Sequence, residues 1–305
     1  MHRFSPKVTP HQRELVLNMN HGLGNQLSLY FAGLAYAKHH NLRLVSNVAI
    51  ARQDNHESFR DILDLNLPGT FNVAGRFPSP HKSKLDQFLS YRLPITFNFT
   101  GNYYSPTVGY DEFLLSKRGI RNLHGFFHTY KYFEYCLAEE PTLETKEIFH
   151  RNIFANQLST EIQKPNSVAL HIRRGDYVGS AESLGLLGSK YYQNALAIIG
   201  RSCRIGNVFV FSDDIEFAKA LFVELGVRNT IFPEENGFLS AKEVIYLLGV
   251  SPNLVIANSS LSYWAAVFAG ENSFVIAQSP FYKNAELSET YFYKPNWTLV
   301  NPEFR

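Results

Sequence analysis

The sequence contains very little cysteine. Only Cys136 and Cys203 occur among its 305 residues. Two cysteines cannot supply the several cross-links of a small disulfide-stabilised secreted domain, and they are too few for a zinc site built from thiolates. We therefore expect no metal, and the composition favours a reducing compartment, which we take to be the cytoplasm.

Long hydrophobic runs are missing as well. No stretch of about 18 consecutive apolar residues occurs, which is the length that a helix needs to cross a bilayer. The first residues are mostly polar and include Pro6 and Pro10, where a secretory signal would carry an apolar segment. We expect a soluble protein with no integral membrane segment.

Neither sign of charge is in excess. The chain has 29 Lys and Arg against 27 Asp and Glu, for a formal net charge of +2. Binding to nucleic acid through counterion release needs a broad basic surface, so we expect no nucleic-acid partner, and any anion site should be local. With 45% hydrophobic residues, the chain has enough apolar material for about two globular domains.

The central feature of the sequence is an apolar run that ends in two arginines. Residues 168–172 have the pattern of a strand buried on both faces, and Arg173 and Arg174 follow directly. Ligands of open α/β sheets bind at the carboxyl ends of the strands, and one guanidinium group can bind two phosphate oxygens at once. The alternative is an Arg-Asp pair that closes a tight turn with Asp176. Residues 174–176 also spell the Arg-Gly-Asp tripeptide of adhesion loops, but an apolar strand leads into them.

Three further apolar runs, at 207–211, 254–257 and 274–277, alternate with helical patterns and predict a doubly wound parallel sheet. Polar side chains follow two of these runs: Asp213 and Asp214, then Asn258, Ser259 and Ser260. Capping of the next helix is one role for them. A carboxylate at this edge can also accept hydrogen bonds from the N1–H and amino groups of guanine.

The amino-terminal half begins with a strand, a glycine turn and a helix. The strand covers about 15–20, Gly22 and Gly24 form the turn, and the helix runs from about 27 to 40. Backbone N–H groups at such a turn suit a phosphate. Five prolines between residues 68 and 106 predict loops and short strands, which would shape an acceptor cleft.

A helix-breaking Lys-Pro-Asn at 164–166 separates the two halves. We predict two domains, at 1–160 and at 161–305, with the last residues of the second crossing back to the first.

Four motifs, in order along the chain, resemble those of the galactoside α-1,2-fucosyltransferase family. They are GLGNQ at 22–26, HIRRGDY at 171–177, FSDD at 211–214 and ANSSLSYWAA at 257–266. The resemblance implies an α/β fold of the GT-B type, with two Rossmann-like domains facing a cleft. It also implies an inverting enzyme that moves L-fucose from GDP-fucose to the 2-hydroxyl of a terminal galactose in an oligosaccharide acceptor, with no cofactor and no metal. In such an enzyme 1–160 would be the acceptor-side domain and 161–305 the GDP-fucose-binding domain, and the protein would meet a membrane only from the periphery, in the assembly of membrane-linked glycans.

The resemblance also implies roles for individual residues. Arg173 would hold the diphosphate and act in catalysis, His171 with Asp213 or Asp214 would recognise guanine, and Asn25 would reach the donor from the opposite domain. The implied donor-binding set is Gly24, Asn25, His171, Arg173, Asp176, Asp213, Asp214, Asn258, Ser259 and Ser260.

The catalytic base is not fixed by the motifs. Inversion needs a proton acceptor near the attacking hydroxyl, and His21, Asp54 and Glu57 are the candidates. His21 stands where the family usually has a glycine, and residues 183–188 replace a family element, which leaves the acceptor open. Two alternatives follow: a GDP-sugar transferase acting on a protein or a core glycan, and an adhesion or glycan-binding module that uses the Arg-Gly-Asp tripeptide.

Overall fold

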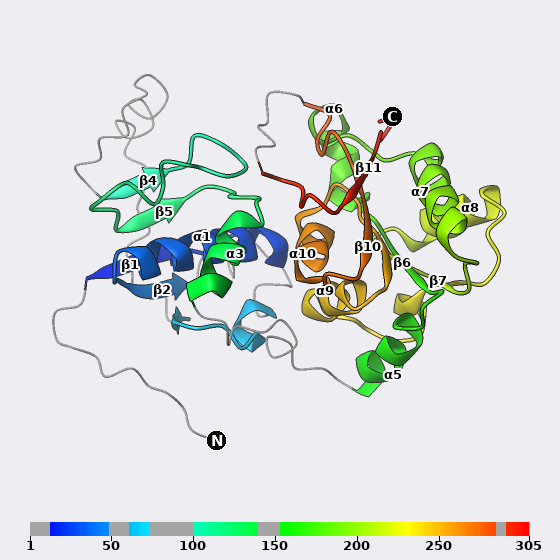
Figure 1. Ribbon diagram of the computed structural model, residues 1–305, viewed down its shortest axis with the longest axis horizontal. Helices are drawn as coiled ribbons and strands as arrows, with labels where there is room; N and C mark the ends of the chain where they lie inside the picture. Colours follow the sequence, from blue (N-terminus) through cyan, green and yellow to red (C-terminus); the bar gives the residue numbers. More distant parts are fainter. Residues whose placement is uncertain (1–12, 49–60, 74–100, 140–152, 285–290, 305) are drawn as a thin grey trace.

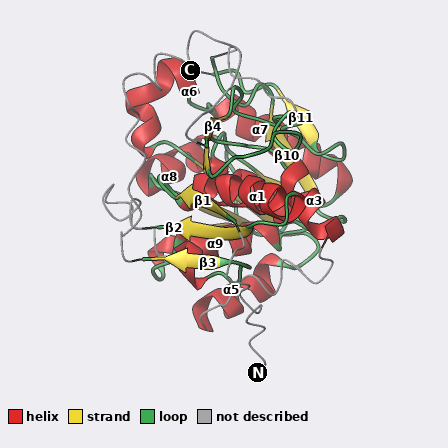
Figure 2. Ribbon diagram, turned by 90° about the vertical axis from the view of Figure 1, so that its left-hand side faces the viewer, coloured by secondary structure: helices red, strands yellow, loops and turns green. Residues whose placement is uncertain are grey.

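The computed structural model describes residues 13–48, 61–73, 101–139, 153–284 and 291–304. Two sheets, both with only parallel pairings, form the framework (Figure 1). Figure 2 shows three strands of the first sheet, β1, β2 and β3, running in one direction beside α1.

The first sheet has five strands in the order β3-β2-β1-β5-β4. Leu15 and Leu17 of the central strand β1 are fully buried, because helices and loops cover this part of the sheet. The strands are β1 (Glu14–Asn18), β2 (Arg43–Asn47), β3 (Thr70–Asn72), β4 (Asn102–Tyr104) and β5 (Asn122–His124). The helical segments of this half are α1 (Leu23–His39), η2 (Asp61–Asp64) and α3 (Lys131–Glu139).

The second sheet has six strands in the order β11-β10-β9-β6-β7-β8. Every residue of the two central strands β6 and β7 is buried, which matches their continuous apolar sequences. The strands are β6 (Val168–Ile172), β7 (Val208–Ser212), β8 (Thr230–Ile231), β9 (Asn253–Val255), β10 (Phe274–Gln278) and β11 (Thr298–Val300). The α-helices are α5 (Ile153–Ile162), α6 (Ala181–Leu184), α7 (Ser189–Ser202), α8 (Ile215–Glu224), α9 (Ala241–Gly249) and α10 (Ser260–Phe268), and the 3₁₀ helices are η3 (Gly175–Ser180) and η4 (Pro233–Glu235).

The predicted α/β fold of the GT-B type is confirmed. Strands of the first sheet come from residues 14–124 and those of the second from 168–300. The predicted domain boundary near residue 160 falls between these two sets and stays a prediction. The edge strands β8 and β11 were not predicted, because two or three residues are too short to show a periodic pattern.

The two halves meet through α1 and α10, which lie between the sheets in Figure 1. The ring of Phe31 stacks on Trp264 with 4.9 Å between centroids, and the indole N–H of Trp264 donates to Ser28 Oγ at 2.7 Å. The backbones also touch: a Cβ on Gly24 would lie 2.4 Å from the carbonyl carbon of Ser260. Only glycine fits this position, so the contact sets how closely the two helix starts approach.

A segment near the end of the chain contacts the first half before β11 joins the second sheet. Thr129 Oγ1 donates to the Tyr291 carbonyl at 2.7 Å, and the ring of Phe292 meets His128 edge-on at 5.9 Å. Within the ranges that the structure describes, no helix is both long and apolar enough to pass through a bilayer.

Gly24→Ala should destabilise the protein by about 1–3 kcal/mol, because the added methyl must push α10 away from α1. Gly200→Ala is the matched control: it lies in α7 with open space around it, so the same substitution should leave stability equal or slightly higher. Urea unfolding of both variants tests this. Equal stability of Gly24→Ala and the wild type would contradict the close contact.

Candidate functional site

Arg173 lies directly after β6 and is held by two carboxylates. Its Nη1 is 2.9 Å from Asp213 Oδ2, and its Nη2 donates to Asp176 Oδ1 at 2.6 Å. The side chain is 31% exposed, so it borders solvent. A guanidinium has five N–H donors. The two ion pairs therefore fix its position and leave donors for an anionic ligand.

Arg174 points to α8 instead. Its Nε is 3.3 Å from Asp214 Oδ2, and its guanidinium carbon lies 3.8 Å from the centroid of Phe217. Its backbone N–H donates to Asp213 Oδ1 at 2.8 Å. These contacts hold the Arg174 side chain of the Arg-Gly-Asp tripeptide against α8, while Gly175 and Asp176 are exposed. An arginine held in this way argues against an adhesion loop.

Asp213 and Asp214 both have structural partners. Asp214 Oδ1 accepts the backbone N–H of Phe217 at 3.1 Å and so caps α8, while its other oxygen pairs with Arg174. Asp213 divides its two oxygens between the Arg174 backbone and Arg173. The capping and turn-closing roles are thus realised, and recognition of guanine by either aspartate stays a prediction.

Glu234 is an acidic residue that the sequence did not single out. It lies in η4 near the backbone of Ser212, the last residue of β7, and its Oε2 is buried without a hydrogen-bond partner among the described residues. Burial raises the pKa of its carboxyl to about 7, against a weaker opposite effect of the backbone at Glu234 and Ser212. It thus combines an unpaired oxygen with a place at the carboxyl edge. Glu234 is less exposed than its neighbour Glu235, and the sequence, in which two glutamates stand side by side, does not show this difference.

His171 is buried in β6. Burial lowers the pKa of its imidazole to about 3, and the charge of Arg173 acts in the same direction. The ring is therefore neutral at physiological pH. Its Nδ1 is buried and has no partner within the described part of the chain.

The start of α10 supplies a helix N-terminus at the same edge. Ser259 caps it by accepting the Leu261 N–H at 3.4 Å, and Ser260 is its half-buried first residue. Asn258 Nδ2 donates to the carbonyls of Leu184 and Gly185 at 2.9 and 3.0 Å. Asn258 thereby ties the loop that follows Arg173 to the end of β9.

Asn25 is oriented by a histidine that the sequence did not identify as functional. Asn25 Oδ1 lies 2.9 Å from His128 Nε2, and His128 Nδ1 lies 3.1 Å from the Tyr282 hydroxyl. Burial lowers the pKa of His128 to about 3, so the ring is neutral: Nε2–H donates to Asn25 and Nδ1 accepts from Tyr282. The amide N–H groups of Asn25 have no partner among the described residues and remain available to a ligand.

His21 is the one base candidate that the structure describes. It is exposed, it has a positive φ of 61°, and its ring stacks on Phe126 at 5.8 Å. Its carbonyl accepts from Gln26 Nε2 at 2.7 Å, which holds the turn. Asp54 and Glu57 lie outside the described residues.

The site is therefore a junction between two sheet edges. Arg173, His171 and Glu234 come from the second sheet, and β6 is hydrogen-bonded to β9, which leads into α10. Gly24 and Asn25 open α1 directly against that helix start. Arg173 and two helix starts offer cationic and N–H groups to an anionic ligand here, although the aspartates that hold the two arginines offset part of their charge.

Comparison with known protein families matches residues 111–301 to "Glycosyl transferase family 11". The chain belongs to this family. The matched segment contains the whole second-sheet side of the site, and the family makes the protein a glycosyltransferase, an enzyme that transfers sugars.

Relatives of this glycosyltransferase occur in Escherichia coli. An alpha-1,2-colitosyltransferase is 31% identical over 290 residues, which are 90% of this chain and 94% of that protein. The O-antigen biosynthesis glycosyltransferase WbnK is 30% identical over 107 residues, or 34% of this chain and 35% of that protein.

Solved structures include two with a similar chain course. A mutant of FUT1 from Arabidopsis thaliana in complex with GDP has a TM-score of 0.48 and 14% identity, over 91% of this chain and 73% of that one. The NodZ alpha-1,6-fucosyltransferase soaked with GDP-fucose has a TM-score of 0.46 and 13% identity, over 85% and 93%.

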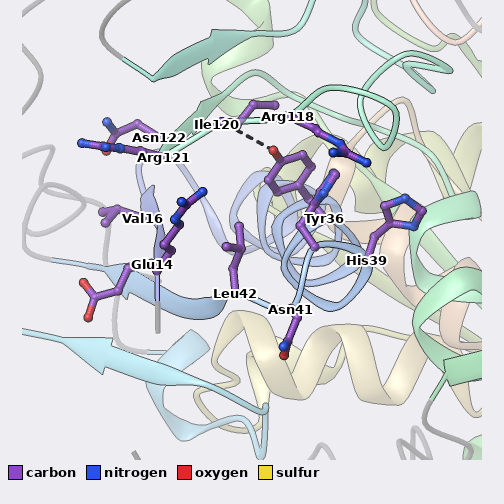
Figure 3. A pocket seen from close by; sticks show the side chains of 13 residues that line it. Glu14, Val16, Tyr36, His39, Asn41, Leu42, Arg118, Ile120, Arg121 and Asn122 are labelled. Carbon is purple, nitrogen blue, oxygen red and sulfur yellow. Dashed lines mark hydrogen bonds between the residues drawn. The ribbon is translucent and has the colours of Figure 1, made fainter. Parts of the chain in front are cut away.

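The glycosyltransferase also has an open pocket of about 1300 Å³ away from this junction (Figure 3). It lies at the amino ends of β1 and β5, and Arg13, Arg118 and Arg121 line it, while none of the predicted site residues does. Tyr36 stands between Arg118 and Arg121 in Figure 3, and its hydroxyl accepts the Ile120 N–H at 3.2 Å. His39, in the last turn of α1, also lines this pocket.

Two replacements of Asp214 should separate the contributions of its two contacts to stability, the cap of α8 and the pairing with Arg174. Asp214→Ala removes both the cap of α8 and the pairing with Arg174, and should cost about 1–2 kcal/mol of stability. Asp214→Asn keeps a capping oxygen and should recover most of that loss. Chemical unfolding at pH 7 measures both. Equal losses in the two variants would show that capping is not the main contribution.

Proposed function

We propose that the protein transfers L-fucose from GDP-fucose to the 2-hydroxyl of a terminal galactose, with inversion and without a metal. The observation that carries this proposal is Arg173, held by Asp213 and Asp176 at the carboxyl end of β6 with donors to spare. Membership in glycosyl transferase family 11 and the four sequence motifs support it.

The reaction is a direct displacement. The oxygen of the acceptor hydroxyl forms a bond to the anomeric carbon, the bond from that carbon to the β-phosphate oxygen breaks, and its electron pair leaves with GDP. Arg173 and the amino end of α10 stabilise the charge that develops on the diphosphate. The hydroxyl proton passes to a base, for which exposed His21 is our candidate.

The nucleotide base would lie between His171 and Glu234. Both have a buried polar atom with no partner among the described residues, and a carboxylate can accept the N1–H and amino groups of guanine together. Asp213 and Asp214 stay candidates for guanine recognition, but each is paired with an arginine. We therefore propose Glu234 as a further acceptor for guanine.

Transfer itself tests the proposal. The protein is incubated with GDP-fucose and lactose in the presence of EDTA, and the product linkage is determined by NMR. We expect a fucosyl group on the 2-hydroxyl of galactose. Transfer only to a folded protein domain or to a core glycan would favour the alternative GDP-sugar transferase.

Colitose is a second candidate for the transferred sugar, because the 31% identical relative is an alpha-1,2-colitosyltransferase. Colitose is L-fucose without the 3-hydroxyl. Competition between GDP-fucose and GDP-colitose for one acceptor gives the ratio of kcat/KM values directly. A ratio in favour of GDP-colitose would replace the donor in our proposal and leave the site unchanged. The cytoplasmic location and peripheral contact with membrane-linked glycan assembly stay predictions.

GDP should raise the melting temperature of the wild type, and Arg173→Ala should abolish this shift because the diphosphate loses its main cationic partner. The same variant should lower kcat by about 10²–10³, as loss of one transition-state donor does. Arg201→Ala, an exposed arginine in α7, is the control and should behave as the wild type. Equal stabilisation by ADP would argue against recognition of guanine.

Affinity for GDP should fall as the pH drops below about 7. The pKa of Glu234 is raised to about 7, so the accepting carboxylate is present above that pH and is lost by protonation below it. Glu234→Gln should bind GDP more weakly and should lose the part of the pH dependence that comes from the Glu234 carboxyl. The part that comes from titration of the GDP phosphate should remain. Calorimetry from about pH 5.5 to 8.5 compares the two. Parallel pH profiles would exclude Glu234 from base recognition.

A further inference from the structure

We propose that Phe126, whose ring stacks on His21, forms an aromatic platform that binds the apolar face of the acceptor's terminal sugar. This inference rests on the proposed function, because it names the acceptor subsite of the same junction. Phe126 is 43% exposed, whereas its neighbour Phe127 is fully buried. An exposed aromatic ring beside a candidate site offers a flat apolar surface to a ligand.

The unusual backbone angles on both sides of Phe126 turn its side chain toward solvent. Gly125 has a φ of 146° and Phe127 a φ of 52°, so left-handed residues flank Phe126 on both sides. A non-glycine residue adopts this conformation only where its surroundings impose it, and such strain clusters at functional sites. Here one phenylalanine enters the core and the preceding one faces outward. A Cβ on Gly125 would lie 2.8 Å from Ser105 Cβ, so the turn leaves no room for a side chain.

The platform lies at the junction already described. β5 and β1 are parallel neighbours, so the loops with Phe126 and His21 leave the first sheet at the same edge. His128, two residues after Phe126, is hydrogen-bonded to Asn25. The acceptor must approach from a side that the nucleotide does not occupy, and this loop belongs to the first sheet, while Arg173 belongs to the second.

The two rings leave surface for a sugar. Their centroids are 5.8 Å apart and their planes differ by 26°, so the rings are nearly parallel. Stacked rings in contact at this separation are offset, which leaves part of each face uncovered. A galactose ring presents C–H groups on one face and hydroxyls at its rim. This face matches a flat aromatic surface, and the rim hydroxyls stay free for hydrogen bonds and for reaction.

Phe126→Ala tests the platform, with Phe126→Trp as the conservative variant. Phe113→Ala is the matched control: Phe113 is 58% exposed and lies in the turn whose Leu115 carbonyl accepts from His40, at the other end of α1. The measurements are KM and kcat for lactose at saturating GDP-fucose, and calorimetric titration of GDP and of lactose.

We expect Phe126→Ala to raise the KM and the dissociation constant for lactose about tenfold or more, with GDP affinity within about twofold of the wild type. Phe126→Trp should restore lactose binding, and Phe113→Ala should match the wild type. Unchanged lactose binding in Phe126→Ala, or an equal loss of GDP and lactose affinity, would overturn the platform. If the wild type binds lactose but transfers no fucose, the proposed function fails, and the titrations still decide the platform.

Discussion

The first turns of two helices meet at a point where no side chain fits. Gly24 of α1 lies against the peptide between Ser260 and Leu261 of α10, and Trp264 locks the pair through Ser28 and Phe31. Each helix follows a strand of a different parallel sheet, so this contact brings the two carboxyl edges together. The positive ends of both helix dipoles then point to one region. An anion is the natural ligand of such a place, and the rest of the site is consistent with it.

Charge at the junction is fixed by the protein before any ligand binds. Asp176 and Asp213 hold Arg173 through short ion pairs, and the side chain still reaches solvent. His171 and His128 are neutral because burial lowers their pKa values to about 3. They contribute hydrogen bonds without adding charge. A preorganised arrangement of this kind stabilises a leaving diphosphate without reorganisation during the reaction.

The sequence predicted the features that rest on long patterns. The apolar runs that form β6 and β7 are buried on both faces, and polar groups of the site follow each run. Because the two strands are parallel, these polar groups lie together at the carboxyl edge of the sheet, as the sequence predicts. Glu234 and His128 were missed because their importance comes from burial and from partners far along the chain. The outward turn of Phe126 depends on backbone angles that no residue pattern between 121 and 128 reveals.

A crystal structure with GDP tests the central claim most directly, because the described residues offer an anion two places to bind. One is the junction with Arg173 and the helix starts, and the other is the arginine-lined pocket at the amino ends of β1 and β5. We predict the diphosphate beside Arg173 and the start of α10, with guanine between His171 and Glu234. Density for GDP in the pocket of Arg13, Arg118 and Arg121, with the junction empty, would contradict the account.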